Sequence, residues 1–382
     1  MDIGAALAML RFPIVSMSLI ALLPQTAVRS EPVSQNQSVP STIRDNRCPA
    51  LDAHDQPFPI GAPHRHVLAA NAGLPAADIS RIAQKIVGQF EGDGESYSTV
   101  SSRDTISIGI SQWNVTAGTL FHTFLAAVGP AELKEASPRL VADLASLKAS
   151  RSGSDSRAKA VLTRWTNAAA GEPLVNGINA RVRSDLEAWL NRPGMRQVQD
   201  KLIQDSMQLA YNYAAAWQKD RSSHNSAAPV DARELTYFDD MVTFSGGNGG
   251  VWIEHVRAYR RQFPKASDAL SDMSHWIDAC VTAKNHGRKL YAVRDAQRNL
   301  AYWQKLASDA PARFDDATMD LVVFAFLRAR QAKGDDHPHG QPGVYQPSVF
   351  YRRALTAIGS GWFSGEAATV KPRDIYAWAS KH

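Results

Sequence analysis

The sequence predicts a mainly α-helical fold with one small β-element beside the first helix. Between Asp78 and Phe90 apolar residues recur with the spacing of one helix face. Isoleucines then alternate with other residues at positions 106, 108 and 110, which is typical of a short strand. The rest of the chain shows helical periodicity almost to its end.

The first helix is expected to begin at Asp78, because an aspartate at this place accepts hydrogen bonds from free backbone N–H groups. The helix is expected to end at the turn Gly92-Asp93-Gly94, and Glu91 therefore stands in its last turn. Its apolar face consists of Ile79, Ile82, Ile86 and Phe90.

Ten further helices are predicted from apolar periodicity, and no repeat of fixed period is present. At 44% hydrophobic residues the chain can bury a large core, which we expect as a helical, two-lobed domain of the α+β class. The expected helices cover residues 117–128, 139–149, 178–191, 194–218, 231–244, 251–262, 266–283, 289–306, 316–331 and 347–358.

The N-terminal residues 1–30 are predicted to be a secretory signal peptide. Arg11 precedes an apolar run from Phe12 to Leu23, and a cleavage site after Ser30 fits the small residues there. The run is shorter than the ~20 residues that span a bilayer, although an uncleaved anchor is the alternative. The expected product is periplasmic or secreted, with no stable membrane insertion.

Three further regions follow the signal peptide. Residues 31–76 are rich in Pro, Ser, Gln and Asn and are expected to form an arm or linker. Residues 77–366 are expected to form the catalytic domain, and residues 367–382 a C-terminal tail. Neither the role of the arm nor an oligomeric state follows from the sequence.

Composition disfavours several kinds of partner. The net charge of +5 is a mild bias that suits an anionic polymer, and no clustered Lys/Arg stripe indicates nucleic acid. Metal-ligand spacings and the glycine patterns of nucleotide sites are missing from the sequence, so we expect no cofactor. Cys48 and Cys280 could form a disulfide in an exported protein, and two separate thiols are the alternative.

Two carboxylates beside a cleft are what acid–base cleavage of a glycosidic bond requires. Glu91 follows an apolar helix face, where partial burial would raise its pKa and suit it to donate a proton. Asp104 lies at the start of the isoleucine-bearing strand and is the candidate for the second carboxylate. Asp93 and Glu95 compete with Asp104, and spacing alone does not rank them.

The stretch Phe90-Glu91-Gly92, Asp104, Ser107-Ile108-Gly109 and Gln112-Trp113 resembles the start of lysozyme-like-superfamily domains in phage and bacterial wall-lytic proteins. Residues 237–250 resemble the aromatic-Asp helix and following turn of that group. Residues 350–361 resemble its closing Arg-containing helix and Gly-Ser-Gly turn. Family-46 chitosanases are distant members of the same superfamily.

The resemblance implies that Glu91 is the acid and that the hairpin forms one wall of a sugar cleft, with Asp104 as the best match for the second carboxylate. Aromatic rings could stack on pyranose faces there, among them Tyr97 and Trp252, although core packing is the alternative for Trp252 and Tyr237. The residues expected to bind substrate are Ser107, Gln112, Trp113, Tyr237, Asp240 and Asn248.

The predicted function is hydrolysis of β-1,4-linked aminosugar polymers, with peptidoglycan as the favoured substrate. A lytic transglycosylase would use Glu91 alone. Chitosanase activity is an alternative that the net positive charge disfavours, because chitosan is cationic. A non-catalytic wall-binding or secretion-associated module with the same fold is the third possibility.

Overall fold

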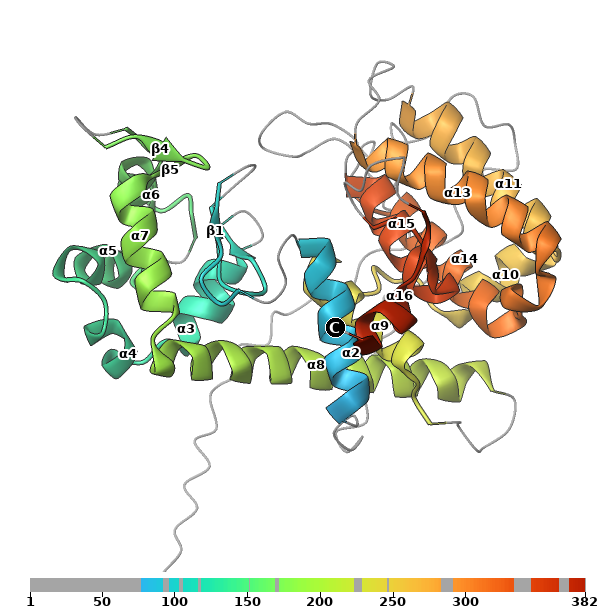
Figure 1. Ribbon diagram of the computed structural model, residues 1–382, viewed down its shortest axis with the longest axis horizontal. Coiled ribbons are helices and arrows are strands. Elements are labelled where there is room, and N and C mark those ends of the chain that lie inside the picture. The colour runs from blue at the N-terminus through green and yellow to red at the C-terminus, as the bar shows by residue number, and fades with distance from the viewer. Residues whose placement is uncertain are drawn as a thin grey trace, which may run out of the picture. The chain divides into compact units, whose positions relative to one another are not determined.

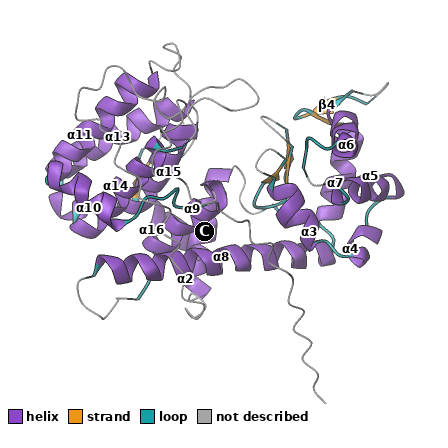
Figure 2. Ribbon diagram, turned by 180° about the vertical axis from the view of Figure 1, so that it is seen from behind, coloured by secondary structure: helices purple, strands orange, loops and turns teal. Residues whose placement is uncertain are grey.

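A computed structural model gives the arrangement of the chain (Figure 1). It describes residues 77–91, 96–102, 106–115, 118–150, 152–168, 172–222, 229–245, 247–282, 291–332, 345–363 and 371–381. All of these fall within one compact unit, Arg47–His382. The described residues are mainly helical, with short antiparallel strands, which confirms the predicted fold class (Figure 2).

The helices follow one another along the chain with short connections. The first half contains α2 (Ala77–Glu91), η1 (Leu120–Phe124), α3 (Leu125–Ala127), α4 (Pro130–Lys134), α5 (Pro138–Lys148), α6 (Ser156–Thr166), α7 (Ala180–Leu190) and α8 (Pro193–Arg221). The second half contains α9 (Ala232–Ser245), α10 (Ile253–Gln262), α11 (Ala266–His275), η2 (Trp276–Val281), α13 (Tyr291–Asp309), η3 (Pro311–Phe314), α14 (Asp316–Arg330), α15 (Tyr345–Ile358) and α16 (Ile375–Lys381).

The strands form three small antiparallel sheets. The first follows α2 in the order β1 (Val100–Ser101), β2 (Ser107–Ile108) and β3 (Trp113–Asn114). The register sets Ile108 opposite both Val100 and Trp113, so these three apolar side chains share a buried face. The other sheets pair β4 (Leu174–Val175) with β5 (Ile178–Asn179), and β6 (Ser360–Gly361) with β7 (Arg373–Asp374).

Side chains that end in oxygen begin several helices. Ser137 accepts a hydrogen bond from the Leu140 amide at the start of α5, and Asp315 accepts one from the Thr318 amide at the start of α14. Asn179 accepts two amide N–H groups at the start of α7. Each contact satisfies a donor that the helix itself leaves free.

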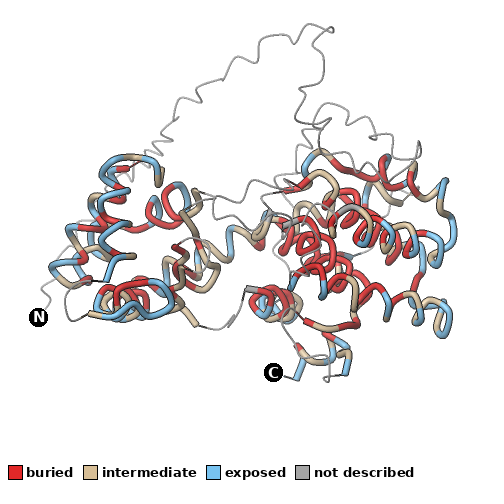
Figure 3. Tube along the Cα trace, turned by 90° about the horizontal axis from the view of Figure 1, so that it is seen from above, coloured by how far each residue is buried: buried red, intermediate tan, exposed pale blue. Residues whose placement is uncertain are grey.

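Buried side chains divide into two hydrophobic clusters, marked by the red stretches in Figure 3. The first cluster joins α2 to the helices from α9 to α16, with Phe238, Trp303 and Phe324 among its largest members. The second cluster contains the sheet β1–β3, η1 and the helices α5 to α7. Helix α8 contributes Met195 to the second cluster and the stretch Met207–Trp217 to the first.

Helix α9 is the central element of the first cluster. It packs against α2, α8 and α15, and every residue from Glu234 to Met241 is buried. A helix that is buried on all sides carries apolar residues around its circumference, and any charged residue on it needs a partner. Two such charges, Asp239 and Asp240, lie near its middle.

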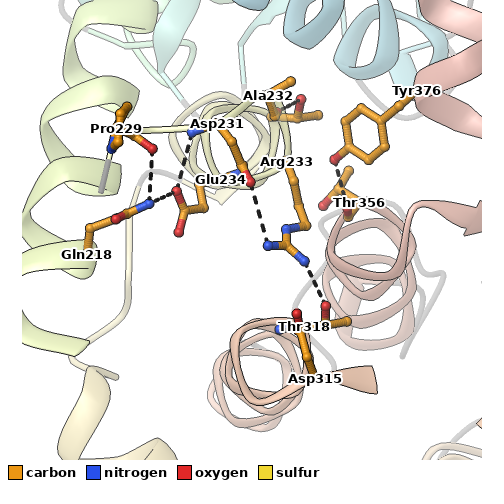
Figure 4. A network of polar contacts seen from close by, with 11 residues as sticks. Gln218, Pro229, Asp231, Ala232, Arg233, Glu234, Asp315, Thr318, Thr356 and Tyr376 are labelled. Carbon is orange, nitrogen blue, oxygen red and sulfur yellow. Dashed lines mark hydrogen bonds and ion pairs between the residues drawn. The ribbon is translucent and has the colours of Figure 1, made fainter. Parts of the chain in front are cut away.

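The N-terminus of α9 is fixed by a capping box (Figure 4). The carboxylate of Asp231 accepts the Glu234 amide at 2.8 Å, and Glu234 accepts the Asp231 amide at 3.4 Å. The Gln218 side chain of α8 donates to the Glu234 carboxylate, and Arg233 donates to the Thr318 hydroxyl of α14 at 2.7 Å. This network ties three helices together at one end of α9.

All ten predicted helices after the first have a counterpart close to their expected bounds, whereas α4, α6 and α16 were not predicted. The expected tail is partly folded: β7 pairs with β6, and α16 packs on α2 with Ile375 and Ala379 fully buried. Ile110, expected in a strand, lies in the turn beyond Gly109. Within the described residues no helix combines the length and apolarity needed to cross a membrane. Residues 1–76 lie outside them.

Replacing Asp231 tests the capping box. Asp231→Ala is expected to lower the free energy of unfolding by about 1 kcal/mol, because the Glu234 amide loses its acceptor. Urea denaturation followed by circular dichroism measures the change. Asp231→Asn keeps an acceptor oxygen and should retain most of the stability. Asp205→Ala, which removes an exposed carboxylate paired with Lys201 within α8, should cost no more than about 0.5 kcal/mol. Equal losses in Asp231→Ala and Asp205→Ala would contradict the capping role.

Candidate functional site

Glu91 is the last residue of α2, as the sequence predicts. Helix α2 reaches this position with Ala83, Ile86 and Phe90 packed in the first cluster. The backbone of Glu91 is therefore placed by a buried helix face. Its side chain lies outside the described residues, as do Asp104 and the competing carboxylates Asp93 and Glu95.

The residue before Glu91 rests on a buried arginine. The Arg352 guanidinium of α15 lies 4.8 Å from the ring centroid of Phe90 and 4.0 Å from that of Phe244. A guanidinium against an aromatic face is attracted by the ring quadrupole, and desolvation strengthens this attraction. The C-terminal end of α2 is thus held on a cation that comes from the other end of the chain.

Asp240 holds this arginine in place. Its Oδ1 receives Arg352 Nη2 at 2.6 Å and Nε at 2.8 Å, and its Oδ2 receives Arg353 Nε at 3.2 Å. All three side chains are almost completely buried. The carboxylate therefore joins α9 to α15 inside the protein. The structure gives Asp240 this structural role in place of the substrate contact expected from the sequence.

Tyr237 and Trp113 are also core residues. Tyr237 is 1% exposed and packs edge-on against Phe238 in the first cluster. Trp113 is 6% exposed, and its ring lies 4.9 Å from Phe124 in the second cluster. Neither ring presents a free face, so a pyranose cannot stack on them in this structure. Both expectations of substrate binding are replaced by a packing role.

Gln112 and Ser107 belong to the first sheet. Gln112 has a positive φ of 50°, and its amide accepts from the Ser101 hydroxyl at 3.1 Å and donates to the Gly109 carbonyl at 2.9 Å. Both ends of its side chain thus close the turn between β2 and β3. Ser107 lies in β2, pairs with Ser101 and Asn114, and is partly exposed. Of these two residues, Ser107 remains the better candidate for a ligand contact.

Asn248 lies in a glycine turn between α9 and α10. Its Oδ1 accepts the Gly250 amide at 3.4 Å, and Arg328 Nε donates to the Gly247 carbonyl at 3.0 Å. Gly249 has a φ of +62°, and a Cβ there would lie 2.7 Å from Arg328 Nε. Only glycine combines this backbone with so close an approach. Asn248 is partly exposed, so the turn offers it to solvent in a fixed geometry.

Comparison of the chain with protein-family models, with curated proteins and with solved structures finds no significant match. The functional interpretation consequently depends on the residues themselves.

Cys48 and the side chain of Cys280 lie outside the described residues, and with them the expected disulfide. In the described part of the chain, no group of three or more His, Cys, Asp or Glu side chains is placed to hold a metal ion.

The buried charges on α9 and α15 were not singled out from the sequence as partners. A signal for them does exist: Asp239-Asp240 and Arg352-Arg353 are paired charges inside otherwise apolar helices. Buried charges of this kind need an opposite charge. The sequence separation of more than a hundred residues hides which acid meets which base.

Asp239 adds a second unusual carboxyl. It is 5% exposed, and burial, with the neighbouring negative charge of Asp240, raises its pKa to about 7 despite a hydrogen bond with Thr243. Because the folded state holds this proton more tightly than the unfolded chain, folding stability should fall as the pH rises from about 4 to about 7.

Asp239→Asn is expected to remove this pH dependence, because asparagine is neutral and can still accept from Thr243. Relative to the wild type, the variant should gain stability between pH 5 and pH 8, with roughly 3 kcal/mol as the upper limit at about 1.4 kcal/mol per pKa unit. Thermal and urea unfolding at both pH values measure the difference. Parallel pH profiles for the two proteins would show that Asp239 is already ionised at pH 5.

Proposed function

We propose that the protein is an exported glycoside hydrolase that cleaves β-1,4-linked aminosugar polymers, with peptidoglycan as the substrate. Glu91 is the proposed proton donor and Asp104 the proposed second carboxylate. The proposal combines the order of carboxylates and strand in the sequence with the way in which the structure supports the end of α2.

The observation that carries the proposal is the buried support beneath Phe90. Arg352 lies between the rings of Phe90 and Phe244 and is bonded to Asp240. A buried ion pair adds little net stability compared with apolar residues of the same volume, so stability alone is a weak reason for it. A catalytic acid, in contrast, needs a backbone that is fixed to within a fraction of an ångström. The support stands directly next to Glu91.

The proposed chemistry follows from two carboxyl groups. Glu91 gives its proton to the glycosidic oxygen as the bond breaks, and Asp104 activates water or stabilises the positive sugar. A separation of about 6.5–9.5 Å between the two groups leads to inversion, and one of about 5 Å to retention. If Asp104 takes no part, Glu91 acts first as acid and then as base, and the substrate's own hydroxyl attacks.

Replacement of the acid tests the proposal. Glu91→Gln keeps the size of the side chain but removes the proton, and lytic activity on purified peptidoglycan is expected to fall by at least about 100-fold. Zymography and release of reducing ends measure the activity. Glu135→Gln, an exposed glutamate next to α4, is the matched control and should keep wild-type activity. Full lysis by folded Glu91→Gln protein would sink the proposal.

The substrate class gives a separate prediction. A protein with a net charge of +5 attracts anionic peptidoglycan and repels cationic chitosan. Release of reducing ends per mole of enzyme is therefore expected to be greater from peptidoglycan, with the difference shrinking as salt screens the charges. A preference for chitosan at low salt would identify the chitosanase alternative instead.

A further inference from the structure

We propose that Tyr97 is an aromatic platform on which one pyranose ring of the polysaccharide stacks, in the loop that follows Glu91. This inference depends on the proposed function for its ligand, a chain of N-acetylated aminosugars. It assigns a sugar-binding role to a residue of the loop, where the buried aromatic residues can have none.

Burial distinguishes Tyr97 from the other aromatic candidates. Trp113, Tyr237 and Trp252 are 6%, 1% and 1% exposed, and all three belong to the hydrophobic clusters. Tyr97 is partly exposed and belongs to neither cluster. A ring can accept a sugar only if part of its surface is open, and among these four residues only Tyr97 meets that condition.

The ring of Tyr97 is already held in one orientation. Its hydroxyl donates a hydrogen bond to the Asp200 carboxylate, and the guanidinium of Arg196 lies 5.4 Å from the ring centroid. Both partners come from α8, one turn apart on a 29-residue helix. Burial and the Asp200 carboxylate raise the pKa of Tyr97 to about 12, which keeps the phenol protonated as a donor. Arg196 covers one face, so a sugar would stack on the opposite face.

Preorganisation of this kind favours binding, because the ring loses little conformational freedom when a ligand arrives. Hydroxyl groups lie on both sides of Tyr97 in the chain. Ser96 and Ser98 are partly exposed, and their hydroxyls lie 2.9 Å apart. Sugar sites combine an apolar face with a few polar groups that fix the orientation of the ligand, and this loop supplies both.

The test measures binding of a soluble N-acetylglucosamine hexasaccharide by isothermal titration calorimetry. All proteins carry Glu91→Gln, so that the ligand survives the titration. Tyr97→Ala is expected to raise Kd by roughly tenfold, the loss of one aromatic contact. Tyr97→Phe keeps the ring and should stay within about threefold of the parent. Tyr291→Ala removes a tyrosine that is 45% exposed elsewhere and should leave Kd unchanged.

Three outcomes would overturn the inference: an unchanged Kd in Tyr97→Ala, an equal loss in Tyr97→Phe and Tyr97→Ala, or no binding by the parent protein. If Tyr97→Ala does not fold, Tyr97→Leu keeps an apolar side chain without a π face and decides in its place. The proposed function fails separately, through lytic activity that survives Glu91→Gln. Tight, Tyr97-dependent binding together with such activity would support the platform and reject Glu91 as the acid.

Discussion

The carboxylate of Asp240 is the group on which the arrangement of the first cluster depends. It neutralises two arginines of α15 within the protein interior, and one of these arginines supports Phe90 at the end of α2. Loss of the carboxylate would leave two buried cations without this counter-charge, which is far more costly than the pair itself is stabilising. The three helices α2, α9 and α15 are consequently fixed relative to one another by charge as well as by packing.

The long periodic elements of the fold could be predicted from the sequence. Helices such as α9, α10 and α14 lie within one or two residues of their expected bounds, because each has several turns of regular apolar spacing. Short elements were missed for a physical reason. Helix α16 has seven residues and owes its burial to contact with α2, which no local pattern reveals. The same holds for the two-residue strands β6 and β7.

The candidate site was less predictable than the fold. The position of Glu91 at the end of a helix follows from local signals, namely an apolar face and a glycine stop. The roles of Asp240, Tyr237 and Trp113 do not, because the identity of a side chain does not tell whether it faces a cleft or the core. The opposite holds for Tyr97, whose value becomes visible only when its contacts with α8 are known.

The order of the two clusters along the chain has a consequence for how the protein acquires its structure. The second cluster runs without interruption from Val100 to Met195, so its contacts can form locally. Helix α2 precedes this stretch, yet its partners α9, α15 and α16 all follow it. Closing so long a loop costs entropy before any contact compensates for it. We therefore expect α2 to dock last, which pulse-labelled hydrogen exchange would show as late protection of its amides. The catalytic helix would then be completed only when the C-terminal residues of the chain are in place.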